Sequence, residues 1–274
     1  MIYKFLHTIY SVLLKDIQIA SKYKFNIILS IINVLIYLFI IFQIDKSFIF
    51  FADNVDGEYD NNLFLFLLIG LIAIEITIVC SNAIPLNINF YQTSGMIEEL
   101  ISSKNSFLFI CIGSTLYPFL RSCLKIFFFF LFGVTLFQLE FYFKVYQLLF
   151  FYLLLVYLIS LIGIGLMAGA FTVFYKRGNP IIQINALVTT LLGGALFPIY
   201  SLNPSIQSFI DLIPGKHFID LSRSIFDNGA SLASLEIYQI LYLTLISIFL
   251  LFLGVIFLKI SINQAIKRDK ILSY

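Results

Sequence analysis

The sequence predicts an all-α membrane protein with six transmembrane helices. Hydrophobic residues make up 61% of the 274 residues and charged residues only 12%, whereas a soluble domain carries about 25% charged residues. Several uncharged runs reach the roughly 20 residues that a helix needs to cross a bilayer. The six predicted spans are residues 25–44, 63–86, 107–139, 145–175, 180–200 and 237–258. The chain contains no internal repeat or low-complexity linker, so we interpret residues 1–274 as a single transmembrane domain.

Residues 1–22 predict an amphipathic helix that lies along the membrane interface. Polar residues recur at alternating spacings of four and three from Lys4 to Lys22, while apolar residues such as Ile9 and Val12 fall opposite them. This spacing places the polar residues on one stripe of a helix. A helix of this kind contacts membrane lipid along its length and does not cross the bilayer.

The distribution of Lys and Arg predicts that both termini are cytoplasmic. With this orientation, eleven of the 17 Lys and Arg residues lie on the inner side and four on the outer side, with Arg121 and Lys125 within the membrane. Such an excess of Lys and Arg on the cytoplasmic side is the usual bias of membrane proteins. The expected location is a bacterial plasma (inner) membrane, where the chain is a multi-pass integral protein, with a plastid membrane as the alternative.

A short charged helix is predicted at residues 95–103, between the second and third spans. Its apolar stripe consists of Met96, Ile97, Leu100 and Ile101. Glu98 and Glu99 fall on the other face near the helix start, where the macrodipole favours acidic side chains. Only Lys104 lies nearby, so attraction of basic residues to anionic lipid does not explain the helix. Two interpretations remain, a surface helix that covers a loop and a docking element for a soluble partner.

Residues 204–228, between the fifth and sixth spans, predict a pair of half-helices that dip into the outer leaflet. Apolar residues recur at helical spacing on both sides of Pro214-Gly215, which interrupts the pattern. Each piece is too short to cross the membrane. Non-helical backbone at such a break is tolerated only where protein or water covers it.

Three ionisable residues fall inside the predicted spans, namely Glu75, Arg121 and Lys125. Arg121 and Lys125 are four residues apart and therefore share one helix face. A charge at mid-bilayer costs about 2.5–3.5 kcal/mol on insertion scales, so it normally faces protein or a water-filled cavity. One interpretation is an ion pair of Glu75 with Arg121 or Lys125 that holds span two against span three. The other is a polar lining of a transport path for an amphiphilic or anionic substrate.

No residue pattern in the chain predicts catalysis or a cofactor site. The glycine-rich loop that cradles nucleotide phosphates is absent from the sequence. The two histidines, His7 and His217, and the three cysteines lack the spacing of metal ligands. No basic cluster indicates nucleic acid as a partner. We therefore expect neither catalytic residues nor a metal or cofactor in this chain.

Small residues in span four predict close helix packing. Gly165 and Gly169 form a Gly-x3-Gly pattern, and small residues let membrane helices approach one another closely. The partner surface is either another span of the same chain or the seam of a dimer.

The order of these parts resembles the ABC-2 type permease family, the membrane subunits of ATP-driven exporters. The resemblance extends over nearly the whole chain. It rests on the amphipathic start, on "GMIEELISSKNS", which looks like the family's coupling helix, and on "GALFPIYSLNPSIQSFIDLIPGKHFIDLSRSIFDNGA". In that last segment the residues that match common family positions are Phe197, Pro198, Pro204, Pro214, His217 and Arg223.

The resemblance implies how the predicted parts work together. The coupling helix, from Gly95 to Ile101, would rest in a cleft of a separate ATP-binding subunit and transmit its closure to the spans. ATP and Mg would be bound by that partner, which would be present in two copies, and this chain would form a homodimer. The half-helices would gate the outer side, with Phe197, Pro198, Pro214, His217 and Arg223 as gate residues.

The resemblance also implies a substrate class. The segment "IPGKHFIDLSRSIF" is closer to members that export drugs and small lipophiles than to polysaccharide exporters, which implies a hydrophobic or amphiphilic substrate. One alternative is export of a lipid-linked polysaccharide. An alternative of another class is a gradient-driven carrier without an ATPase, although such carriers usually show repeated halves or helices broken at the midplane.

Overall fold

The computed structural model describes residues 2–53, 63–102, 107–137, 148–175, 179–196, 209–226 and 237–267. Within these ranges the chain is almost entirely helical and contains no β-strand. The elements in chain order are α1 (Ile2–Lys22), α2 (Lys24–Asp53), α3 (Leu63–Thr93), α4 (Ile97–Ser102), α5 (Phe107–Gly113), α6 (Leu116–Phe137), α7 (Leu148–Tyr175), α8 (Asn179–Leu187), the π-helix η2 (Val188–Leu192), α10 (Pro214–Phe226) and α11 (Ile237–Lys267).

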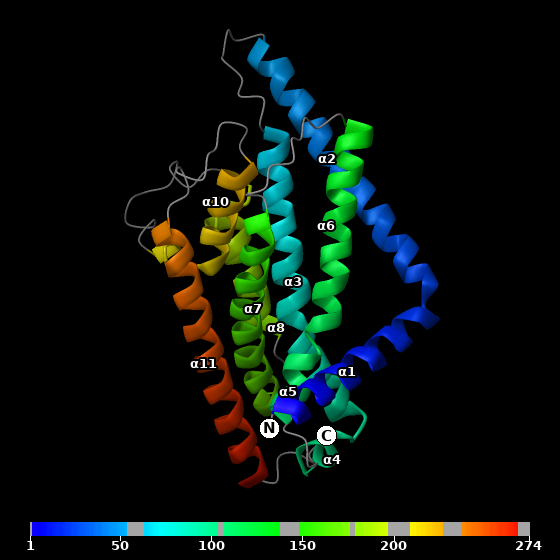
Figure 1. The fold of residues 1–274 in the computed structure, drawn as a ribbon, viewed down its shortest axis with the longest axis vertical. Coiled ribbons are helices and arrows are strands. Elements are labelled where there is room, and N and C mark those ends of the chain that lie inside the picture. The colour runs from blue at the N-terminus through cyan, green and yellow to red at the C-terminus, as the bar shows by residue number, and fades with distance from the viewer. Residues whose placement is uncertain are drawn as a thin grey trace.

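The prediction of an all-α membrane protein is confirmed. Among the described residues, five helical segments are long and apolar enough to cross a membrane: Ile28–Ser47, Leu63–Thr93, Phe107–Leu136, Leu148–Tyr175 and Ile237–Ala265. They correspond to predicted spans one, two, three, four and six, and they run along the long axis of the molecule (Figure 1). The helices that correspond to predicted spans two and six, α3 and α11, extend beyond their predicted ends, to Thr93 and Lys267.

The predicted fifth span, residues 180–200, is not one continuous helix. It forms α8 and η2 and then bends at residues 193–196, while residues 197–200 lie outside the described part of the chain. The amide of Gly193 donates to the carbonyl of Val188 at 2.9 Å, which closes the wider π turn. Gly194 then adopts a φ of 78°, which favours glycine because a side chain would be strained there. Two consecutive glycines therefore end the helix early.

The predicted third span is interrupted near its start. Helix α5 ends at Gly113 and α6 begins at Leu116. Between them the hydroxyls of Ser114 and Thr115 donate to the carbonyls of Cys111 and Ile112, each at 2.7 Å. Ser and Thr that bind nearby carbonyls in this way compete with the regular helical pattern and often bend it.

Helix α3 lies at the centre of the fold and is the most widely connected element. It packs against α6, α7, α8 and α10, and residues along most of its length are buried. Helix α7 packs between α3 and α11. By contrast α2 and α11 expose many large apolar side chains, as expected for helices that face lipid.

Small residues allow the close packing around α7. A Cβ on Gly169 would lie 2.8 Å from Ile88 and one on Gly165 would lie 3.1 Å from the Ser81 carbonyl oxygen, both on α3. The sequence left two partner surfaces for Gly165 and Gly169, another span of the same chain or a dimer seam. The contacts with α3 support packing within the chain. On the other side of α7, a Cβ on Gly163 would lie 2.5 Å from the carbonyl carbon of Leu250 on α11.

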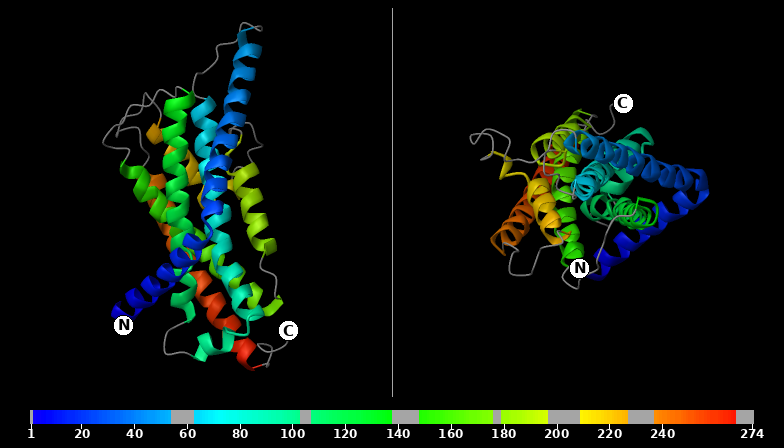
Figure 2. Two further views of the ribbon diagram at one scale, coloured as in Figure 1. Left: turned by 90° about the vertical axis from the view of Figure 1, so that its right-hand side faces the viewer. Right: turned by 90° about the horizontal axis from the view of Figure 1, so that it is seen from above.

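Helix α1 lies across one end of the bundle at a wide angle to α2 (Figures 1 and 2). The two helices are separated at Tyr23, whose amide donates to the Ala20 carbonyl at 3.0 Å. Helix α1 packs against α5, where Val12 and Ile9 contact Gly113. The helix predicted for residues 1–22 is thus present, and its position at one end of the spans is the place where an interfacial helix would lie.

Candidate functional site

The predicted coupling segment forms a short helix at one extreme end of the molecule. Helix α3 ends at Thr93, Gly95 turns the chain with a φ of 71°, and α4 follows from Ile97 to Ser102. Helix α4 lies beyond the end of α3, at the same end of the molecule as α1 and the last turns of α11 (Figure 1). Residue 103, the last of the predicted segment, lies outside the described residues.

The two faces of α4 differ as its sequence predicts. Ile97 is only 3% exposed, and Leu100 and Ile101 pack against the apolar core of the bundle. Glu98 and Glu99 are exposed on the opposite face. Met96, before the helix, is 39% exposed. The helix is therefore anchored by its apolar side and presents two carboxylates away from the bundle.

A polar contact joins α1 to the end of α3 that leads into α4. The Lys15 ammonium donates to the Tyr91 hydroxyl at 3.1 Å and also lies 3.3 Å from the Asp16 carboxylate. Burial raises the pKa of the Asp16 carboxyl, and the Lys15 charge opposes this effect. Because α1 also packs on α5, the interfacial helix contacts both elements that flank α4.

The intramembrane charges make the contact that the ion-pair interpretation expects. Glu75 of α3 and Lys125 of α6 form an ion pair, with side chains 19% and 18% exposed. Arg121, one turn earlier on α6, instead donates to the Ser30 hydroxyl of α2. The three residues thus link α2, α6 and α3 in series. Sequence reasoning left both cations open as the partner of Glu75, and the structure selects Lys125.

Of the predicted half-helices, residues 209–226 are described, and α10 is the longer helix among them. Residues 204–208 and 227–228 lie outside the described residues, as do the predicted gate residues Phe197 and Pro198. Pro214 begins the helix, and its apolar face, which includes the fully buried Phe218, packs into the bundle against α3, α7 and α11. Figure 1 shows α10 toward the end of the molecule opposite to α4.

Arg223 fastens α10 to two other segments through backbone carbonyl groups. Its guanidinium donates to Gly194 at 2.7 Å, to Phe66 at 3.0 Å and to Ala195 at 3.1 Å. The same guanidinium lies 3.3 Å from the centre of the Phe66 ring. It therefore satisfies carbonyls where the fifth predicted span breaks and at the start of α3. A Cβ on Gly70 would lie 2.0 Å from the Ala195 carbonyl oxygen, so only glycine permits this approach.

His217 lies at the start of α10 beside α11. Its Nε2 is 2.8 Å from the Asp211 carbonyl oxygen, and its ring centre is 4.7 Å from that of Tyr242. Asp211 forms an ion pair with Lys216. The described contacts of His217 and Arg223 are therefore to the chain itself, and they hold α10 in place.

A buried polar cluster that the sequence reasoning missed joins α10 to α3 and α7. The Thr77 hydroxyl donates to the Ala73 carbonyl at 2.6 Å, so it accepts from the Tyr157 hydroxyl. A Cβ on Gly215 would meet both Tyr157 and Thr189 of η2. The ring of Tyr157 also stacks on Phe218, with centres 4.6 Å apart. The signals that the sequence offered were Thr77 and Tyr157, each inside a largely apolar span.

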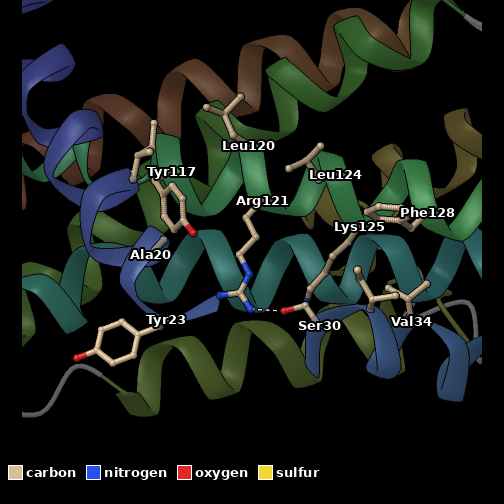
Figure 3. Close-up of a pocket in the computed structure, with 12 residues that line it drawn as sticks. Ala20, Tyr23, Ser30, Val34, Tyr117, Leu120, Arg121, Leu124, Lys125 and Phe128 are labelled. Atoms are coloured by element: carbon tan, nitrogen blue, oxygen red, sulfur yellow. Dashed lines mark hydrogen bonds between the residues drawn. The ribbon is translucent and has the colours of Figure 1, made fainter. Parts of the chain in front are cut away.

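Two adjoining pockets lie where α1, α2 and α6 meet. The larger has a volume of about 310 Å³ and the smaller about 260 Å³, and both include Ala20, Tyr23, Tyr117 and Arg121 in their walls. Figure 3 shows the Arg121 side chain extending between Tyr117 and Ser30, with Lys125 beside it. This is the place where the charged residues of α6 come next to open space.

The comparisons with known proteins agree with this arrangement. No curated protein matches the sequence. The family model described as "ABC-2 type transporter" matches residues 7–226, which include most of α1, the first four membrane-crossing segments, α4 and α10. This chain belongs to the ABC-2 type transporter family, membrane components of transporters that work with an ABC ATP-binding partner.

Proposed function

We propose that this chain is the permease subunit of an ABC exporter that moves a hydrophobic or amphiphilic substrate. Two copies of the chain would work with two copies of a separate ATP-binding subunit, which holds the ATP and Mg. The observation that carries this proposal is the geometry of α4. It is a short helix at the end of the bundle, fixed by Ile97 and presenting Glu98 and Glu99 outward.

Helix α3 supplies a mechanical connection from α4 to the opposite end of the molecule. Its 31 residues correspond to about 46 Å at 1.5 Å per residue. One end leads into α4, the middle binds α6 through Glu75, and the other end accepts a hydrogen bond from Arg223 of α10. Closure of the ATP-binding subunits would displace α4 and tilt α3, and the tilt would reach α10 directly.

The proposed orientation places α4 and both termini in the cytoplasm and α10 toward the outer side of a bacterial plasma membrane. The Lys and Arg distribution supports this orientation. The positions of α4 and α10 toward opposite ends of the bundle fit the same orientation. Helix α10 would act as the outer gate, because it packs against α3, α7 and α11 without crossing the membrane.

Co-purification from native membranes tests the proposal. The tagged full-length chain is isolated in mild detergent, and bound proteins with nucleotide-binding loops are identified by mass spectrometry. We expect the wild type to retain an ATP-binding subunit and the Glu98→Lys/Glu99→Lys variant to lose it, since the variant reverses the charge of the exposed face. If the wild type retains no ATP-binding subunit, the proposal is wrong.

A matched control separates docking from general charge effects. Lys46→Glu reverses an exposed charge on α2, whose last turns lie at the end of the molecule opposite to α4 (Figure 1). We expect this variant to retain the ATP-binding subunit at the level of the wild type. Equal loss from the control and from the α4 variant would contradict the assignment of α4 as the docking element.

A further inference from the structure

Helix η2 differs from α8 in the spacing of its hydrogen bonds. The Gly193 amide donates to the Val188 carbonyl, at 2.9 Å, where an α-helix would use the Thr189 carbonyl. A π turn of this kind places one extra residue in an otherwise α-helical path, and such turns occur often at functional sites. A helix can hold the same extra residue one turn earlier, here in α8, while both of its ends stay in place.

Two successive threonines make this shift nearly neutral for the buried hydroxyl cluster. Thr189 is 1% exposed, and its hydroxyl lies within hydrogen-bonding reach of the Tyr157 phenol. Thr190 is half-buried and instead donates to the Ala186 carbonyl, at 2.7 Å. Moving the extra residue one turn earlier turns the residues between by about 100°, so Thr190 would come close to the place that Thr189 leaves. Tyr157 would keep a threonine partner in both arrangements.

The observed arrangement has an unfavourable feature that the shifted one would remove. The side-chain amide nitrogen of Asn185 is buried and has no hydrogen-bond partner in the part of the chain that the structure describes. A buried donor without an acceptor destabilises a fold. The same shift would bring Ala186, which has no polar side chain, to the place of Asn185 and turn the amide outward.

The shift would be confined to a short segment, because the chain is held on both sides of it. On one side Arg223 of α10 donates to the carbonyls of Gly194 and Ala195. On the other side Ile182 is 2% exposed, and α8 packs against α3. Residues 185–190 lie between these two points, so they can turn while the rest of the segment keeps its contacts.

We propose that η2 is a movable π turn, which shifts by one helical turn into α8 and exchanges Thr189 for Thr190 at the Tyr157 hydroxyl. Gly215 of α10 packs on Thr189, so the exchange takes place directly against the helix assigned above to the outer gate. Helix register shifts occur in microseconds to milliseconds, so the two arrangements equilibrate during any of the measurements below. The inference goes beyond the proposed function and does not depend on an ATP-binding subunit.

Cysteine cross-linking tests the shift in the purified full-length chain. An added Cβ at Gly215 would lie 2.7 Å from the Thr189 side chain, so Gly215→Cys faces position 189. It is combined with Thr189→Cys or with Thr190→Cys, in a background where the three native cysteines are changed to alanine. After oxidation with copper phenanthroline, the remaining thiols are counted by gel shift with a polyethylene glycol maleimide.

We expect both pairs to form a disulfide, because each threonine occupies the place beside Gly215 in one arrangement. The control pair is Gly215→Cys with Leu191→Cys. Leu191 is 46% exposed and does not come to that place in either arrangement, so both thiols should stay free. A cross-link at position 189 alone, or at none of the three positions, would overturn the proposal. Cross-links at all three would also overturn it, because the segment would then have no defined arrangements.

Valine substitutions give a second test that needs no cysteine beside α10. Valine keeps the shape of threonine but removes the hydroxyl. We expect Thr189→Val and Thr190→Val each to lower the melting temperature only slightly, because the other threonine can then serve Tyr157. The double variant should lower it by more than the sum of the two, and this excess should vanish in a Tyr157→Phe background. A double variant without any excess would overturn the proposal, since a fixed helix predicts that Thr189 alone serves Tyr157.

Discussion

Two arginines occupy very different surroundings in this fold. Arg223 is enclosed by three backbone carbonyls and the ring of Phe66. Arg121 donates to the Ser30 hydroxyl among its contacts and borders two pockets. Carbonyls at broken or starting helices need a donor wherever water is excluded, and Arg223 supplies it. The difference indicates that Arg223 maintains the fold, whereas Arg121 lies beside open space.

We expect replacement of Arg223 to have the largest effect on stability. Arg223→Met keeps an apolar stem but removes the donor for the carbonyls of Gly194, Ala195 and Phe66, which should cost about 3–5 kcal/mol. Arg223→Lys should recover only part of this, since an ammonium lacks the planar fork. Thermal unfolding can be followed with a thiol-reactive dye, because Cys80 and Cys111 are buried free thiols. Stability equal to that of the wild type would show that Arg223 has no structural role.

The close contact between Gly70 and the Ala195 carbonyl should be nearly as sensitive to substitution. Gly70→Ala would place a Cβ 2.0 Å from the Ala195 carbonyl oxygen, so the backbone must shift and we expect a loss of about 2–4 kcal/mol. Gly133→Ala on α6 is a matched control, because its Cβ would lie 3.8 Å from the nearest side-chain atom. The same unfolding assay should place the control at or above the wild type. A stable Gly70→Ala variant would contradict the packing at the start of α3.

Removing one member of the intramembrane ion pair should have an intermediate effect. Glu75→Leu leaves Lys125 without its carboxylate and should cost about 2–3 kcal/mol. The second change Lys125→Leu should restore most of the loss, because it removes the cation that lost its carboxylate partner. Arg121→Leu in the Glu75→Leu background should restore less. Better rescue by Arg121→Leu would mean that Arg121 is the true partner of Glu75.

The buried hydroxyl groups of Thr77 and Tyr157 should contribute less to the stability of the fold. Tyr157→Phe removes the hydrogen bond to Thr77 but keeps the ring stacked on Phe218, so we expect a loss of about 1 kcal/mol. Thr244→Val, on the exposed face of α11, is the control and should change stability little. Transport activity of the Tyr157→Phe variant would then report whether the link between α10 and α7 matters for gating.

Arg121→Gln should change stability least, by less than about 1 kcal/mol, because Gln can still bind the Ser30 hydroxyl. Loss of stability as large as that of Arg223→Met would remove the distinction between the two arginines. The thermal unfolding assay, run on both variants side by side, decides this point.

Some of the site could be read from local patterns in the sequence. Residues 95–103 were predicted as a short helix with Ile97 inward and Glu98 outward, and both features are present. Such a helix depends on contacts between neighbouring residues. The break of the fifth span was missed, although Gly193 and Gly194 were a visible signal. Glycine both interrupts helices and allows close packing in membrane helices, so this pair alone did not identify the break.

Five long apolar runs and the acidic helix that lies between two of them follow from the amino-acid sequence, because insertion into a bilayer depends mainly on the hydrophobicity of each segment. The choice of Lys125 over Arg121 as the partner of Glu75 does not follow from it. Both cations share one helix face, and only the placement of α2 beside α6 brings Ser30 to Arg121 and leaves Lys125 facing α3. The carbonyls held by Arg223 likewise come from segments far apart in the chain, whose meeting depends on how the helices pack.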